Sequence, residues 1–113
     1  MHELPVTQSL LEIALRHAQE SGAQRIVSLD LVIGQYASLV DDSIQFYWDM
    51  IAEGTLAEGA RLVFHRLPAR FECQSCQTQY SPVEDDFACP ACGGEQVALI
   101  SGREFYLESI DVT

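Results

Sequence analysis

Four cysteines in two closely spaced pairs constrain this chain more than any other feature of its sequence. The pairs are Cys73-Gln-Ser-Cys76 and Cys89-Pro-Ala-Cys92, and Gly93-Gly94 follows the second. Each C-x-x-C pair places two thiolates at one tight turn, and two such turns facing each other supply the tetrahedral sulfur set that zinc prefers. Four protein ligands leave no coordination position open to water or substrate. The spacing therefore predicts a closed, structural zinc site.

Two disulfides or a thioredoxin-like redox pair are the competing interpretations of these cysteines. The N-terminus Met1-His2-Glu3-Leu4-Pro5 lacks the basic start and apolar stretch of a signal peptide, and no apolar run approaches the roughly 18 residues of a membrane span. We therefore expect a cytoplasmic protein. In that reducing compartment structural disulfides are rare, so two matched pairs fit a metal better than either alternative.

The segment around the cysteines, residues 69–100, is short, turn-rich and poor in large aliphatic side chains. Such a segment cannot bury enough apolar surface to fold unaided, so metal binding would supply its folding free energy, about 10 kcal/mol or more. We interpret it as a zinc-ribbon module inserted into a main domain formed by residues 1–68 and 101–113.

The main domain is predicted to be α+β, a three-stranded sheet packed with two helices. Helical spacing of apolar residues predicts one helix from Pro5 to about Ser21. A β-branched run predicts a strand over 25–33, and alternating side chains predict strands over 60–67 and 104–112. A second helix is expected to be capped by Asp41 or Asp42. Its apolar stripe comprises Ile44, Tyr47, Trp48, Ile51 and Ala52.

Charge and composition exclude several classes of function. The chain of 113 residues carries 17 acidic and six basic residues, a formal charge of −11, and all the basic residues are arginine. Without lysine there is no Schiff-base chemistry and no Walker-type phosphate loop, and no nucleophile–base pattern points to an enzyme. An acidic surface also repels nucleic acid and anionic lipid, so we expect protein or cation partners.

The second residue, His2, offers a different metal site. A bulky second residue is expected to block removal of the initiator methionine, which keeps the Met1 α-amine next to His2. That amine, the His2 backbone nitrogen and the imidazole can close adjacent chelate rings in a planar nitrogen set suited to nickel(II) or copper(II). Taken alone, a histidine in second position is more often an ordinary surface residue.

Motifs along the whole chain together resemble the HypA/HybF family, nickel-insertion accessory proteins of NiFe-hydrogenase maturation. The resemblance implies a nickel metallochaperone that works with the GTPase HypB to load nickel into the hydrogenase large subunit precursor. The motifs are Met1-His2-Glu3-Leu4, Val32-Ile33-Gly34, Gly54-Thr55, Ala57-Glu58-Gly59, the paired C-x-x-C turns with Cys89-Pro90, Gly102 and a closing strand containing Ile110.

Carried onto this chain, the resemblance implies two metal sites. His2 is the principal nickel ligand, with the Met1 α-amine beside it, Glu3 next to or in the site, and Asp41 as a nearby carboxylate. The four cysteines would hold structural zinc. A carrier must release its cargo, so few ligands on a chain end and micromolar affinity are expected for nickel. The chain is expected to be a monomer or a weak or domain-swapped dimer.

Two other classes of protein carry zinc ribbons, namely nucleic-acid-binding modules and structural zinc adaptors. Arg66, Arg70 and Arg103 are too few to form a basic face, which argues against nucleic acid. His17 and His65 are expected to have surface or packing roles. Phe46, Tyr47 or the outer face of the first helix is expected to contact a protein partner, and the sequence does not choose among them.

Overall fold

The computed structural model describes residues 3–83 and 86–113, which form two compact units. The first unit contains the chain up to Val32, together with Ser38–His65 and Tyr106–Thr113. The second contains Ile33–Ala37 and Arg66–Phe105. Compactness does not test independent folding, so the sequence-based division into 1–68 with 101–113 and 69–100 stays a prediction.

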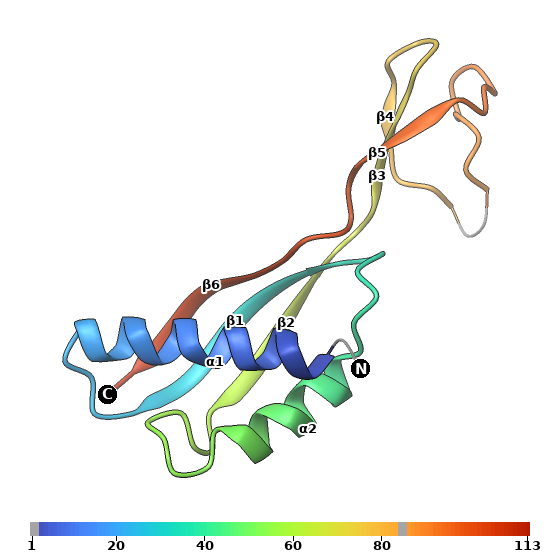
Figure 1. Cartoon of the computed structure of the whole chain (residues 1–113). Helices are drawn as coiled ribbons and strands as arrows, with labels where there is room; N and C mark the ends of the chain where they lie inside the picture. Colours follow the sequence, from blue (N-terminus) through green and yellow to red (C-terminus); the bar gives the residue numbers. More distant parts are fainter. Residues whose placement is uncertain (1–2, 84–85) are drawn as a thin grey trace. The chain divides into compact units, whose positions relative to one another are not determined.

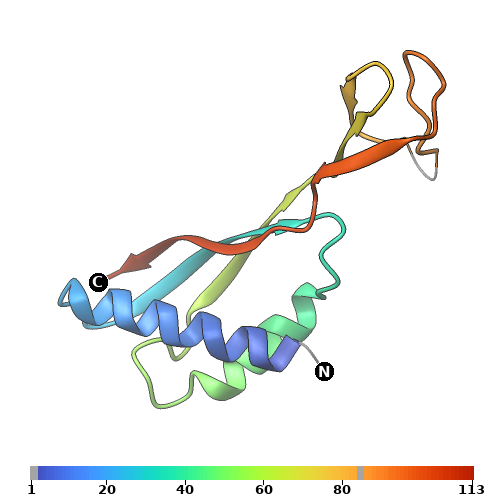
Figure 2. The ribbon, with the colours of Figure 1, turned by 45° about the horizontal axis from the view of Figure 1, so that its top comes forward.

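The first unit contains both helices, α1 (Glu3–Glu20) and α2 (Asp41–Ile51), which contact each other. Helix α1 buries Leu10, Ala14 and Ala18, which recur every four residues along one stripe. Alanine at two of these positions allows close packing. In both views of the ribbon the helices lie on the same face of the sheet (Figures 1 and 2).

The sequence analysis expected Asp41 or Asp42 to cap α2, and the structure corrects this expectation. Neither Asp41 nor Asp42 caps the helix, because Val40 occupies the N-cap position and no side chain bonds there. The two aspartates are instead the first two helical residues. Carboxylates in a first turn interact favourably with the helix dipole, which explains their position without a capping bond.

The first sheet has three strands, β1 (Ile26–Gly34), β2 (Arg61–Leu67) and β6 (Phe105–Val112), in the order β2-β1-β6 (Figure 1). The central strand β1 buries Leu29, Leu31 and Ile33 completely. These three residues are two apart and so share one face of the strand, while Asp30, between Leu29 and Leu31, lies on the other face. The predicted α+β fold, with a three-stranded sheet and two helices, is therefore confirmed.

The open face of this sheet carries a polar ladder that joins its three strands. Asp30 Oδ1 lies 2.9 Å from His65 Nε2 on β2, and Asp30 Oδ2 accepts a 2.9 Å hydrogen bond from Ser109 on β6. Ser28 donates a parallel 2.9 Å bond to Asp111. The bond to His65 and then the bond to Ser109 hold the pKa of Asp30 below its ordinary value.

The second unit contains a smaller sheet of β3 (Arg70–Cys73), β4 (Gln79–Tyr80) and β5 (Val97–Ser101), in the order β4-β3-β5. Both pairings are antiparallel, with Phe71 opposite Tyr80 and Cys73 opposite Val97. Its buried cluster consists of Cys73, Tyr80 and Cys89, against which Phe71 and Val97 pack. A core this small needs an additional cross-link.

Two glycines allow two backbones to touch within this second unit. A Cβ atom built on Gly34 would lie 2.2 Å from the carbonyl carbon and oxygen of Gly102. The chain is fixed there because Tyr36 N donates to Gly102 O and Gly34 N donates to Glu104 O, both at 2.7 Å. No side chain fits at position 34, which accounts for the glycine after Val32 and Ile33.

Within the described ranges, neither helix is long and apolar enough to cross a membrane.

The polar ladder leads to a prediction about acid behaviour. A group with a depressed folded pKa stabilises the fold above its unfolded value, about 3.9 for aspartate, and loses that contribution as pH falls through the folded pKa. His65→Ala should raise the pKa of Asp30 towards this ordinary value and move acid unfolding to higher pH. Carboxyl NMR titration measures the first effect, and His17→Ala on α1 is the matched control. An unchanged Asp30 titration in His65→Ala would contradict the assignment.

Candidate metal centre

The two C-x-x-C segments fold into the same kind of turn. Gln77 N donates to Cys73 O and Gly93 N donates to Cys89 O, both at 2.8 Å. In each turn the amide of the first cysteine also donates to the carbonyl five residues later. Cys73 N donates to Thr78 O at 2.9 Å, and Cys89 N donates to Gly94 O at 2.8 Å. Both turns also need a left-handed residue at the fourth position after the start, Gln77 with φ 62° and Gly93 with φ 75°.

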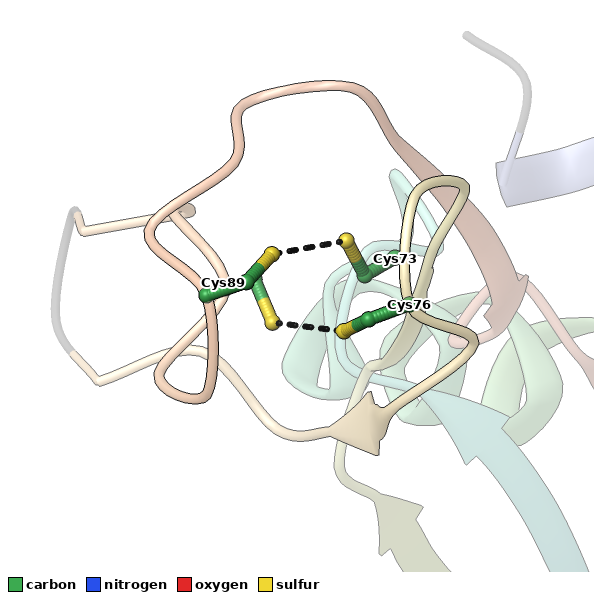
Figure 3. Close-up of side chains that lie close together, drawn as sticks. Cys73, Cys76 and Cys89 are labelled. Carbon is green, nitrogen blue, oxygen red and sulfur yellow. Dashed lines mark hydrogen bonds between the residues drawn. The ribbon is translucent and has the colours of Figure 1, made fainter.

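The turns bring the four sulfur atoms together. All four Sγ atoms lie within 4.8 Å of one another, and the Cys73–Cys92 and Cys76–Cys89 separations are both 3.6 Å (Figure 3). A tetrahedral ion with metal–sulfur bonds of about 2.3 Å separates its sulfurs by about 3.8 Å, whereas a disulfide needs about 2.05 Å. All four cysteines are free. The donor set fits a tetrahedral metal ion rather than two disulfides.

Hydrogen bonds favour the thiolate form of two of the cysteines. The Thr78 hydroxyl lies 3.1 Å from Cys76 Sγ and, with the Thr78 amide, lowers the pKa of Cys76 to about 6. The amides of Cys76 and then Ser75 lower the pKa of Cys73. Since the thiolate is the metal ligand, these bonds prepare both sulfurs for coordination.

Cys92 shows why four such sulfurs require a cation. The Gly94 amide lowers the pKa of Cys92, but the neighbouring sulfurs, Cys73 first, outweigh it and raise the pKa to about 12. Like-charged groups this close cannot all ionise on their own. A divalent cation among them supplies the missing positive charge and reverses the effect. The electrostatics therefore agree with the geometry.

Residues that the sequence analysis did not single out support the cysteine turns. The Tyr80 hydroxyl donates a 2.5 Å hydrogen bond to the backbone oxygen of Phe87. The Phe71 ring packs against both aromatic rings, with its centroid 6.1 Å from that of Tyr80 and 5.7 Å from that of Phe87. Burial, followed by the charges of Cys89 and Cys73, raises the pKa of Tyr80, so its hydroxyl remains a donor. Thr78 was also missed, although a hydroxyl residue two positions after a ligating cysteine is a usable signal.

The other expected site residues fall in different places. Met1 and His2 lie outside the described residues. Glu3 is the first residue of α1 and is 9% exposed, and Asp41 is the first residue of α2. The starts of the two helices lie side by side in both ribbon views (Figures 1 and 2). Glu3 and Asp41 therefore stand at the same end of the first unit.

Neither of the two described histidines belongs to a metal-binding group. Among residues 3–83 and 86–113, the cysteine cluster is the one group of three or more metal-ligating side chains close enough to share an ion. His17 lies 3.8 Å from Glu20 on the exposed side of α1, and His65 belongs to the open-face polar ladder.

The matched turns generate a prediction about backbone strain. A side chain at a left-handed position costs roughly 1–2 kcal/mol, so Gly93→Ala should weaken metal binding by about 5- to 30-fold. Gln77→Gly, at the equivalent position, should leave binding unchanged or strengthen it. Cobalt(II) titration in competition with a chelator measures both. Equal affinity of Gly93→Ala and the parent chain would contradict the strain argument.

The chain is similar to known proteins over nearly its whole length. A family model described as hydrogenase/urease nickel incorporation metallochaperone, HypA, matches residues 1–112. A hydrogenase maturation factor HypA of Dehalococcoides mccartyi is 40% identical over 112 residues, covering 99% of this chain and 94% of the relative. The HypA of Geobacter metallireducens is 40% identical over 113 residues, covering 99% of both chains.

Two solved structures share the fold. The solution structure of a HypA protein has a TM-score of 0.76 at 24% identity and covers 100% of this chain and 97% of its own. That of the Ni metallochaperone HypA from Helicobacter pylori has a TM-score of 0.67 at 22% identity, with coverage of 97% and 96%. Identities this low speak for the fold alone. The match of the family model to nearly every residue, together with relatives at 40% identity over 94% and 99% of their length, shows that this chain belongs to the HypA family of hydrogenase maturation factors.

Proposed function

We propose that this protein is a nickel metallochaperone that binds Ni(II) at its N-terminus and helps to insert it into the large subunit precursor of a NiFe hydrogenase. The observation that carries this proposal is the match of nearly the whole chain to a family of nickel incorporation proteins. The resemblance to this family implies that transfer would proceed with the GTPase HypB, and the chain contains no lysine-bearing phosphate loop of its own.

The proposed nickel ligands are the Met1 α-amine and the His2 backbone and imidazole nitrogens, a set suited to a planar nickel(II) ion. Glu3 and Asp41 contribute charge at the same end of the first unit. The starts of α1 and α2 carry partial positive charge from their helix dipoles, which by itself repels a cation. Carboxylates in both first turns, Glu3 on α1 and Asp41 on α2, offset this repulsion.

The four cysteines are proposed to hold structural zinc. Their sulfur set is what zinc prefers, and four protein ligands close the coordination sphere. A closed site retains its ion, whereas a carrier needs a site that opens. The two sites thus have different tasks, and the closed cysteine site lacks the open coordination position of a catalytic zinc. We propose that the protein acts as a carrier and not as an enzyme.

The first prediction from this proposal concerns the N-terminus. Four alanines added before Met1 move the α-amine out of chelating range of His2, and His2→Ala removes the imidazole, so each change should abolish high-affinity nickel binding. Binding in the parent chain should weaken below about pH 7, where protons compete for an imidazole of pKa about 6.5 and an α-amine near 7.7. Calorimetric nickel titration of untagged protein is the measurement.

His17→Ala provides the matched control, because His17 is an exposed histidine of α1 that lies 3.8 Å from Glu20. It should bind nickel like the parent chain, and the zinc content of all these proteins should be equal. Nickel affinity that is the same in the parent, the extended chain and His2→Ala would rule out the N-terminal site. The protein would then be better explained as a structural zinc adaptor.

The second prediction concerns zinc. Cys73→Ser or Cys92→Ser should lose the metal and disorder residues 69–100, because the small buried cluster around Cys73 and Tyr80 cannot hold that segment alone. The first unit should stay folded on its separate core of Leu29, Ile44 and Trp48, each 0% exposed. Elemental analysis and amide hydrogen exchange measure the two effects.

Ser75→Ala is the control within the same turn, since this change keeps the backbone amide that faces Cys73. It should retain one zinc per chain. A cysteine variant that kept its zinc with unchanged exchange protection would contradict the four-sulfur assignment.

A further inference from the structure

Helix α2 exposes an apolar pair that its packing does not explain. Phe46 is 63% exposed and Met50 is 53% exposed, and the spacing of four residues places them side by side on the helix. Asp42 and Asp49 are exposed along the same side, and Glu53 is exposed two residues after the helix ends. We call these five residues the α2 outer face.

The helix does not need this pair in order to pack. Its inner stripe contains Ile44 and Trp48, both 0% exposed. A helix that already buries such a stripe gains nothing in folding from a second apolar pair in water. Exposed aromatic and methionine side chains framed by charge are typical of a recognition surface.

The α2 outer face is also held in place, which favours docking. Phe46 packs edge-on against Tyr47, with ring centroids 5.5 Å apart and planes at 68°. Gln45 Nε2 donates a 2.8 Å bond to Asp49, and Gln45 Oε1 accepts a 3.2 Å bond from Leu62 N on β2. The Asp49 carboxylate is therefore tied through Gln45 to the sheet. A rigid surface loses little conformational freedom on binding.

The first helix offers no comparable surface. Its one large exposed apolar residue among those described is Ile13, at 36%. On the exposed side of α1, Ile13 is surrounded by polar residues such as Glu12 and Arg16. Of the partner-contacting candidates considered from the sequence, the structure therefore favours α2.

We propose that the α2 outer face binds a basic amphipathic helix of a partner protein. Apolar side chains of that helix would cover Phe46 and Met50, and its lysines or arginines would pair with Asp42, Asp49 and Glu53. This combines an apolar centre with complementary charge at the rim, which is the usual anatomy of a helix-in-groove or helix-on-face interface.

Charge distinguishes this occupant from the other candidates. A second copy of the chain would bring the same three carboxylates against their own equivalents, and each chain carries a formal charge of −11. Like charges brought together at an interface disfavour association. An anionic membrane is excluded by the same repulsion. The surface requires no nickel, so the proposal goes beyond nickel carriage and does not depend on it.

The test uses the full-length zinc-loaded protein and a synthetic amidated peptide of leucine and lysine patterned as an amphipathic helix. NMR shifts on peptide addition should map to residues 42–53. Phe46→Ser and Met50→Ser should each raise the peptide Kd by about tenfold or more, as expected for anchor residues. Asp49→Asn should weaken binding less and reduce its salt dependence.

Three controls make the experiment decisive. Ile13→Ser removes an exposed apolar residue from α1 and should leave the Kd unchanged, and the same peptide with glutamate in place of lysine should not bind. Because Phe46 and Met50 are exposed, their variants should keep the parent circular dichroism spectrum and nickel affinity. Loss of nickel binding in His2→Ala with unchanged peptide binding would separate this proposal from the function proposed above.

Several results would overturn the proposal. One is an unchanged Kd in both Phe46→Ser and Met50→Ser, and another is a shift map that lies outside α2. Equal binding of the glutamate peptide would remove the charge argument. Sedimentation showing a dimer that Phe46→Ser dissociates would assign the surface to a second copy of the chain instead.

Discussion

Four sulfur atoms within 4.8 Å of one another are the constraint on which the second unit depends. The pKa of about 12 at Cys92 shows that such a cluster cannot ionise completely by itself, while the pKa of about 6 at Cys76 shows that ionisation begins readily. A cation resolves this conflict and at the same time ties together two turns that are far apart in sequence. The buried cluster around Tyr80 is too small to do so through packing.

The sequence predicted the parts of this architecture that depend on residue type and spacing. The cysteine pairs have one favourable arrangement around a metal, and the apolar periods of α1 and β1 are long enough to be unambiguous. The predicted cap of α2 was wrong because aspartate is favoured both at the N-cap and in the first turn of a helix. The extended backbone of Val40 is what places the N-cap one residue before Asp41. The polar ladder of Asp30, His65 and Ser109 joins three distant strands, so no local pattern signals it. Thr78 was missed for a different reason, since threonine is common in turns.

The two metal sites proposed for this chain require different physical designs. The cysteine site is closed and fixed by paired turns with bonds of 2.8–2.9 Å. The proposed nickel site uses a chain end next to Glu3, whose side chain is only 9% exposed at the start of α1. That burial anchors the residue after His2, so the ligands proposed for nickel would extend from a firm base while keeping few bonds to break on release. Nickel would be released easily because few ligands hold it, and the start of α1 would fix the position of those ligands.

The same acidic charge would serve both the cargo and the partner. A formal charge of −11 raises the local concentration of cations, which helps a carrier whose affinity must stay modest. It also opposes self-association, which leaves exposed apolar residues such as Phe46 and Met50 available to partners of opposite charge. In a neutral protein the same apolar pair would favour unspecific contacts between copies. Apolar contact alone would not make the α2 outer face selective. The negative charge of the chain, which contains no lysine, restricts binding at this surface to partners of opposite charge.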